Sequence, residues 1–265
     1  MEARLREMND VSSEFSDDES FDDLVEKTRS DRANVRAIAA GRLTFSEDRR
    51  AAPVLMDLMS DPSAKVRGMA AIGLGQHEAE EARGLLLEHL KSDPNGDVRS
   101  MCVSSLGYIG GADEAIVSAL DDPHQHVRMS AVTALNVLNK TSAAGRLLGM
   151  LGDSDWTVRY FTCCALIDFN TGDQRIVDAL HQLHEMPEAR EMVENFAYGD
   201  VINVLFERYE DDTQLAADLD SLEDESPEET LRILREKYGE EMVPYPPEDP
   251  LGDMISQAQE LLGQA

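Results

Sequence analysis

Hydrophobic positions recur along the middle of the chain at two spacings, one within helices and one from helix to helix. Apolar residues follow the three-to-four-residue spacing of an α-helix in segments such as ARGLLLEHL at 82–90. The pattern then returns at steps of 31, 32, 29 and 31 residues, marked each time by the dipeptide Val-Arg. A repeat of this length holds two helices and predicts a solenoid of stacked hairpins. The dipeptides are Val35-Arg36, Val66-Arg67, Val98-Arg99, Val127-Arg128 and Val158-Arg159.

The residues around each Val-Arg pair repeat as well. A small residue lies four positions after the Val and a Leu eight positions after it, which places all three on one helical face. An Asp precedes each Val by four or five positions and is followed in three repeats by Pro. We expect this Asp to cap the helix, with Pro at the first helical position. The small residues are Ala39, Ala70, Cys102, Ala131 and Thr162, and the leucines are Leu43, Leu74, Leu106, Leu135 and Leu166.

The recurring spacing of Asp and Arg from repeat to repeat predicts a structural ladder along the stack. Each Arg follows its Asp by five or six positions, so it can reach either its own Asp or the Asp of the next repeat. The residues that we assign to this ladder are Asp31, Asp61, Asp93, Asp122 and Asp153 together with Arg99, Arg128 and Arg159.

These repeats resemble a known family. Segments such as DPSAKVRGMAAIGLG and DPHQHVRMSAVTALN are similar to the short HEAT-like repeats of phycobilisome lyases, over about residues 20–185. The resemblance implies an all-α fold, a right-handed α-α superhelix of about five to six helical hairpins followed by C-terminal helices. It also implies that the Val-Arg helices line the inner face. It is specific for fold and weak for function, because lyases, hydroxylases and many scaffolds share the repeat.

The two ends differ from the repeats in composition. We predict an acidic disordered N-terminus at 1–19, the solenoid at 20–210, and an acidic C-terminal extension with one or two helices at 211–265. Gly75, Gly110-Gly111 and Gly172 are expected in turns between helices. Near the C-terminus we expect helices at 171–186, 187–199 (stopped by Gly199), 200–210, 226–239 (capped by Ser226) and 251–265, with a stiff linker at 243–250.

Charge narrows the classes of partner. The formal net charge is −29, and residues 1–30 and 206–265 carry −6 and −14 of it. Such a balance opposes binding to nucleic acids, which relies on Lys and Arg, and docking on anionic membranes. The bases are 5 Lys and 19 Arg. A salt-rich cytoplasm, or a GC-rich genome combined with acidic tails, would each explain this balance, and the residues leave both open.

Cysteine use and the absence of apolar runs indicate the compartment. Cys102, Cys163 and Cys164 lie in apolar helical segments, so we expect reduced core thiols. The first residues lack both a basic region and an apolar stretch, and no run of about 18 apolar residues occurs. We therefore predict a cytoplasmic protein without a membrane span.

No arrangement of residues in the sequence indicates catalysis, a cofactor or a bound metal. HEAT-like deoxyhypusine hydroxylases bind two irons through His-Glu pairs just after the Val-Arg position, where this chain has pairs such as Ala37-Ile38 and Ser100-Met101, which cannot ligate iron. His124 and His126 are read as surface histidines of a turn, since residues two apart lie off one helical face. No phosphate-binding glycine loop and no nucleophile elbow is present.

We therefore predict a non-catalytic scaffold or adaptor that binds a protein partner on the repeat surface. The alternative is a phycobilin lyase-like protein, in which Tyr108, Trp156, Tyr160 and Phe161 would stack on a chromophore. Trp156 is either a contact residue or packed against the next repeat. The candidate contact residues are Arg36, Lys65, Arg67, His124, His126, Trp156 and Tyr160.

Overall fold

The computed structural model describes residues 15–16, 19–208, 213–222, 225–239, 242–243 and 246–265. Every regular element in these ranges is a helix, and the expected all-α solenoid fold is confirmed. The chain forms two compact units, Met1–Met150 (unit 1) and Leu151–Ala265 (unit 2). Among the described residues no helix is both long enough and apolar enough to cross a membrane.

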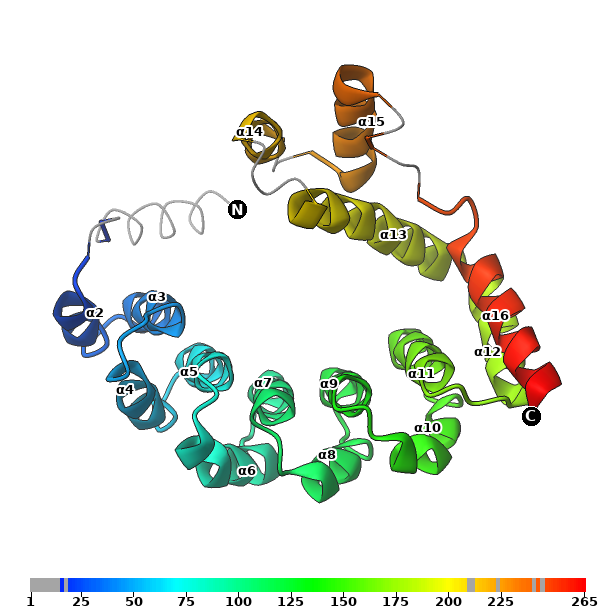
Figure 1. Ribbon diagram of the computed structural model, residues 1–265. Helices are drawn as coiled ribbons and strands as arrows, with labels where there is room; N and C mark the ends of the chain where they lie inside the picture. Colours follow the sequence, from blue (N-terminus) through cyan, green and yellow to red (C-terminus); the bar gives the residue numbers. More distant parts are fainter. Residues whose placement is uncertain (1–14, 17–18, 209–212, 223–224, 240–241, 244–245) are drawn as a thin grey trace. The chain divides into compact units, whose positions relative to one another are not determined.

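Unit 1 is a row of helical hairpins (Figure 1). Helices α3, α5, α7 and α9 carry the Val-Arg dipeptides and pack side by side in that order, and α2, α4, α6 and α8 each pack on the Val-Arg helix that follows. Short 3-10 turns, η1 (Glu80–Ala82) and η2 (Thr141–Ala143), precede α6 and α10. The helices are α2 (Phe21–Lys27), α3 (Ala33–Thr44), α4 (Ala51–Leu58), α5 (Ala64–Gln76), α6 (Arg83–Ser92), α7 (Gly96–Ile109), α8 (Asp113–Ala119), α9 (Gln125–Val137) and α10 (Ala144–Met150).

The predicted core positions are buried in every repeat. The Val, the small residue and the Leu of each Val-Arg helix are at most 1% exposed, including Val158, Thr162 and Leu166 in unit 2. The small residue has a packing role, because a short side chain lets the neighbouring helix approach. Spacing alone therefore located the core of the stack.

The predicted helix caps of α5, α7 and α9 were wrong by two residues. The N-caps of α5, α7 and α9 are Ser63, Asn95 and His124, and each follows the Asp-Pro pair. The Asp instead closes a turn before the helix, since its Oδ1 accepts the backbone N–H two residues later at 2.8 to 2.9 Å in Asp61, Asp93 and Asp122. This side-chain turn leaves the rest of the carboxylate free for another partner.

The glycines predicted in turns differ in role. Gly110 and Gly111 do form a turn, with φ angles of 73° and 70° that favour glycine. Gly75 was misplaced, since it lies inside α5. A Cβ atom on Gly75 would come within 2.8 Å of the Ser105 Cα in α7, so the glycine permits close contact between neighbouring repeats.

Unit 2 contains α11 (Trp156–Asp168), α12 (Gln174–His184), α13 (Pro187–Arg208), α14 (Thr213–Ser221), α15 (Pro227–Tyr238) and α16 (Pro250–Gln264). The expected stop at Gly199 was wrong, because α13 runs through it without a break. Helix α16 packs along α12 and α13, and Gly172, in the turn before α12, lies against the Leu261 backbone of α16. The C-terminal helix is therefore part of a packed unit.

A second, smaller core forms near the C-terminus. It joins α13 to α14 and α15 and consists of Leu205, Leu215, Leu219, Leu231, Leu234 and Val243. Residues 211–265 thus hold three described helices, α14, α15 and α16, where the sequence suggested one or two. Apart from residues 15, 16 and 19, the predicted disorder at 1–19 lies outside the described residues, and the boundary at 210 stays a prediction.

Candidate functional site

The Arg side chains connect neighbouring repeats of unit 1. Arg67 Nε and Nη2 donate to the two carboxylate oxygens of Asp93 at 2.7 and 2.8 Å, while its Nη1 donates to the Asp61 backbone carbonyl at 2.9 Å. Arg36 binds the Asp61 carboxylate in the same way, and Arg99 binds that of Asp122. Each Arg therefore bridges its own turn and the next one with a two-pronged ion pair.

The carboxylates of this ladder are held in their charged form. Burial would raise the pKa of Asp93, but hydrogen bonds from Arg67, the Asn95 backbone and His89 outweigh it and lower the pKa to about 2. The hydrogen bond from Arg36 lowers the pKa of Asp61. Burial would also raise the pKa of Asp122, but the hydrogen bonds from Arg99 and the His124 backbone outweigh it and lower the pKa.

The remaining ladder residues show parts of the same pattern. Arg128 and Arg159 donate through Nη1 to the backbone carbonyls of Asp122 and Asp153, at 3.0 and 2.8 Å. Arg159 Nη2 lies 3.7 Å from the sulfur of Met186, which precedes Pro187 where earlier repeats have Asp-Pro. The Asp31 carbonyl accepts from Arg36.

Two of the candidate contact residues belong to the ladder by their position. The side chains of Arg36 and Arg67 are 13% and 11% exposed, and each guanidinium group forms an ion pair with an Asp of the next repeat. The structure therefore places them among the interactions that hold the repeats together. Sequence reasoning had separated them from Arg99, although all three occupy the same position in the repeat.

The open face of unit 1 is formed by residues at one position before and three, six and ten after each repeat Val. These offsets fall on one side of a helix. Large apolar side chains are exposed there: Phe45 (80%), Val137 (68%), Tyr108 (65%) and Ile72 (38%). Lys65 also lies on this face, exposed and 3.4 Å from the Asn34 side-chain oxygen in the previous repeat. Counting from the repeat Val would have found these apolar residues, which sequence reasoning missed apart from Tyr108.

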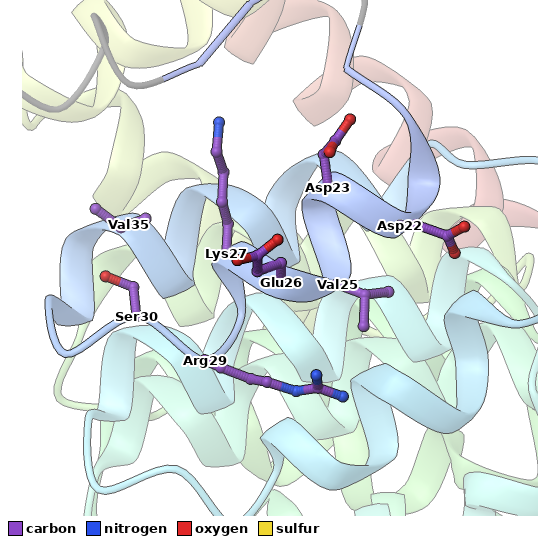
Figure 2. Close-up of a pocket in the computed structure, with 8 residues that line it drawn as sticks. All are labelled: Asp22, Asp23, Val25, Glu26, Lys27, Arg29, Ser30 and Val35. Atoms are coloured by element: carbon purple, nitrogen blue, oxygen red, sulfur yellow. The ribbon is translucent and has the colours of Figure 1, made fainter.

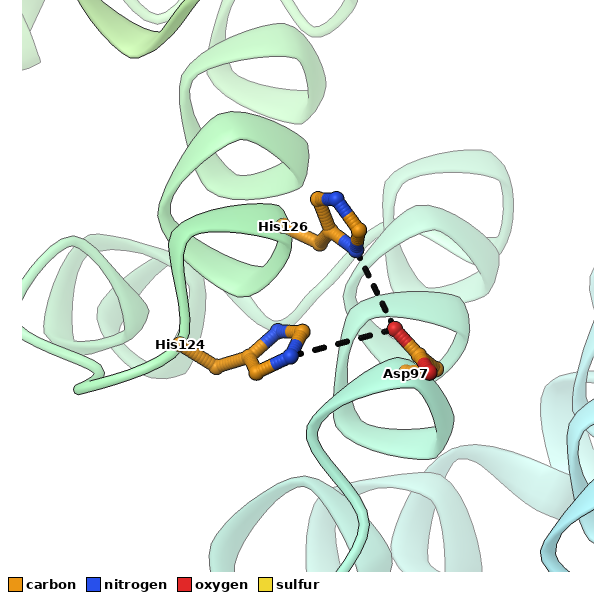
Figure 3. A group of neighbouring side chains, drawn as sticks. All are labelled: Asp97, His124 and His126. Atoms are coloured by element: carbon orange, nitrogen blue, oxygen red, sulfur yellow. Dashed lines mark hydrogen bonds and ion pairs between the residues drawn. The ribbon is translucent and has the colours of Figure 1, made fainter. Parts of the chain in front are cut away.

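His124 and His126 meet an acidic residue of the neighbouring repeat. His126 Nδ1 lies 3.1 Å and His124 Nε2 3.9 Å from the same oxygen of Asp97 (Figure 3). Asp97 lies in the first turn of α7, His124 is the N-cap of α9, and His126 is in its first turn. Sequence reasoning missed Asp97, because 27 residues separate it from His124 and only the stacking of repeats brings them together.

Trp156 and Tyr160 lie in unit 2. Trp156 begins α11 and is partly buried. Tyr160 is 9% exposed, burial raises its pKa, and its ring packs against Phe161 and Phe196 with centroids 5.3 and 6.3 Å away. Tyr160 also lines a hollow of about 450 Å³ whose walls are otherwise Val193, Phe196, Ala197, Asp200, Val201, Val204, Pro247, Pro250, Asp253 and Met254.

A larger hollow of about 960 Å³ lies at the first hairpin, lined by α2, the turn that follows it and Val35 of α3 (Figure 2). Its walls are mostly charged, and the labelled side chains point in different directions without meeting at one point. Lys27 forms an ion pair with Glu19. This arrangement offers no converging set of groups for a small ligand.

The thiols of Cys102 and Cys163 lie in the core, that of Cys164 is partly buried, and all three are poor nucleophiles. No disulfide joins them, and burial raises the pKa of Cys102 and Cys163 to about 12 and that of Cys164 to about 11. Since the thiolate is the reactive form, these cysteines are suited to packing.

Comparison with known proteins identifies the repeat. A sequence model of HEAT repeats matches residues 21–107 and 85–166, together more than half of the chain. The chain belongs to the HEAT-repeat family. Comparison with curated proteins gives no sequence match. The matched residues contain all five Val-Arg dipeptides, so the ladder and the core positions lie within the family's repeat.

Solved structures show the same fold at low identity. The complex of CpcE and CpcF of phycocyanin lyase from Nostoc sp. PCC7120 is similar with a TM-score of 0.56 and 17% identity, covering 94% of this chain and 96% of that one. The YibA protein of Escherichia coli has a TM-score of 0.52 and 18% identity, with 97% and 95% covered. At such identities the likeness concerns the fold alone.

Proposed function

We propose that this HEAT-repeat protein is a non-catalytic scaffold that binds a protein partner on the open face of α3, α5, α7 and α9. The observation that carries the proposal is the set of exposed apolar side chains in or directly after these four Val-Arg helices. Exposed apolar groups gathered on one surface are typical of protein interaction sites, and aromatic residues such as Phe45 and Tyr108 often dominate their binding energy.

The ladder supports this proposal from the other side of the same helices. It connects neighbouring repeats through groups that are mostly buried, and the exposed apolar residues of the open face take no part in these ion pairs. A rigid array of helices with a surface free to vary suits recognition of an extended protein surface. The net charge of −29 argues against a nucleic acid or an anionic membrane as the partner.

The test compares two triple variants in affinity capture from extract of the source cells, with crosslinking and mass spectrometry. The first replaces Phe45, Tyr108 and Val137 by Ser on the open face. The matched control replaces the exposed residues Asp57, Glu88 and Glu114 by Ser, one each on α4, α6 and α8. Thermal melting of both verifies that the fold is kept.

We expect one stoichiometric protein to be captured by the wild type and by the control, crosslinked to the open face, and to be lost with the first variant. Equal capture by all three forms, or crosslinks confined to α4, α6 and α8, would contradict the proposal.

A further inference from the structure

Neighbouring repeats of unit 1 bring two imidazoles and one carboxylate together at the surface. Asp97, His124 and His126 each offer one ligand atom, and the three atoms lie within 4.8 Å of one another. This is the one such group of His, Cys, Asp or Glu within the part of the chain that the structure describes. We propose that Asp97, His124 and His126 bind one divalent transition-metal ion and so connect α7 to α9.

The distances fit such a site after a small contraction. With metal–ligand bonds of about 2.0 to 2.1 Å in a tetrahedral site, ligand atoms lie roughly 3.3 Å apart. The His126–Asp97 distance of 3.1 Å is already in this range, and the His124–Asp97 distance of 3.9 Å exceeds it only slightly. The exposed side chains of Asp97 and His126 can move to close the difference, and all three ligand atoms already lie within 4.8 Å of one another.

His124 and His126 can face the same ligand although they are two residues apart, because they do not both lie in a helix. His124 is the N-cap of α9, and its φ and ψ angles of −92° and 123° are those of extended chain. Only His126 lies within the helix. The bend between them turns the two rings toward each other, with centroids 5.0 Å apart and both facing Asp97 (Figure 3).

The His124 ring packs against the backbone of α7 at Gly96. A Cβ atom on Gly96 would lie 2.3 to 2.8 Å from three atoms of His124, so the ring rests where only glycine leaves room. In this position its Nδ1 is buried without a hydrogen-bond partner, which costs free energy. The packing thus holds the ring with Nε2 toward Asp97, although Nδ1 then lacks a hydrogen bond.

The ligand set defines the class of metal. Two imidazoles and one carboxylate suit zinc, nickel, cobalt or copper, and disfavour magnesium and calcium, which take oxygen ligands. Three protein ligands leave at least one coordination position for water or another group. Asp97 and His126 both stand directly before a repeat Val, so the proposed metal site lies on the open face.

The test is calorimetric titration of the metal-free full-length protein with Zn²⁺ in the presence of excess Mg²⁺, which occupies non-specific acidic positions. Co²⁺ replaces Zn²⁺ in a second experiment to report coordination through its visible spectrum. We expect one Zn²⁺ per chain, a visible cobalt spectrum with nitrogen ligation, and a thermal midpoint raised by several degrees at saturating Zn²⁺.

Three variants and one control make the test specific. Asp97→Asn and His126→Gln each remove one ligand and should weaken Zn²⁺ binding at least about tenfold. Gly96→Ala removes no ligand but displaces the His124 ring, so it should also weaken binding. His181→Gln, at an exposed histidine of unit 2, should leave binding unchanged.

Two results would overturn the site: no Zn²⁺ binding in the presence of Mg²⁺, or binding equally strong in His126→Gln and the wild type. The His126 side chain is about half exposed, so His126→Gln should fold even if the Asp97 or Gly96 variant does not.

Discussion

At the residue scale, the ladder Asp is the position where sequence and structure are most closely connected. One carboxylate does two things in each repeat: it closes the turn before a helix and it receives the Arg of the preceding repeat. Asp93 is the most buried example, with Arg67 and His89 both donating to it. Because its charge is stabilised only in the folded protein, the stability of the fold should depend on pH through this residue.

We expect Asp93 to contribute about 2 kcal/mol to the free energy of unfolding above pH 4. Its folded pKa of about 2 lies below the ordinary value of 3.8, so this contribution is lost as the pH falls from about 4 toward 2. Urea unfolding of the wild type and Asp93→Asn, followed by circular dichroism from pH 2 to pH 5, measures it. The two stabilities should differ at pH 5 and converge near pH 2.

Asp121→Asn is the matched control for this prediction. Asp121 also forms an ion pair with an Arg at 2.7 Å, but both side chains are more than half exposed. Such surface pairs contribute less than about 1 kcal/mol. A gap between the wild type and Asp93→Asn that stays constant with pH would show that the Asp93 charge is not the source of its stabilisation.

At the element scale, two helical glycines that look alike in the sequence have opposite surroundings. Gly75 in α5 lies against Ser105 of the next repeat, while beyond the adjoining backbone of α13 no atom lies within 4 Å of a Cβ built on Gly199. Helix propensity favours alanine at both positions. Only the contact between repeats distinguishes them: the neighbouring helix leaves no room for a side chain at Gly75, whereas Gly199 has room for one.

We expect Gly199→Ala to stabilise the protein by roughly 0.5 to 1 kcal/mol, because alanine restricts the unfolded chain and meets no obstacle in α13. Gly75→Ala should destabilise it, since the new methyl group would collide with the Ser105 backbone and push α5 away from α7. Thermal unfolding of the two variants beside the wild type checks both signs. Equal effects of the two changes would contradict this account.

At the scale of the whole molecule, charge is the dominant property. The 53 acidic residues outnumber the 24 basic ones by more than two to one, so the folded chain is subject to net self-repulsion. The ladder pairs are short-range and largely buried, and are therefore screened less by salt than the excess acidic charge.

We therefore expect the thermal midpoint to rise as NaCl is raised from about 0.01 M to about 1 M, where the Debye length falls from about 30 to about 3 Å. Helical content measured in the same series separates the two explanations of the acidic composition. Loss of helix in dilute buffer would favour adaptation to a salt-rich cytoplasm, and full helicity there would favour acidic tails. A midpoint that falls with salt would show that ion pairs outweigh repulsion.

The sequence by itself determined the repeat, its period and its buried positions. A residue such as Leu74 is fixed in the core by helical spacing alone, because periodicity within a helix and between repeats depends only on the local order of residues. The sequence left two possible Asp partners for each Arg of the ladder, since both its own Asp and that of the next repeat lie within reach of a long side chain.

Only the tertiary structure decided which groups from different repeats meet. In the structure Arg67 binds the carboxylate of the next repeat and Gly75 lies against Ser105. Stacking of the repeats also brings Asp97 close to His124 and His126. The tertiary structure also exposed Phe45 and Tyr108 on one surface of unit 1. The physical reason is the same in each case: these contacts depend on the distance and rotation between stacked helices, which packing sets and the order of residues within one repeat does not contain.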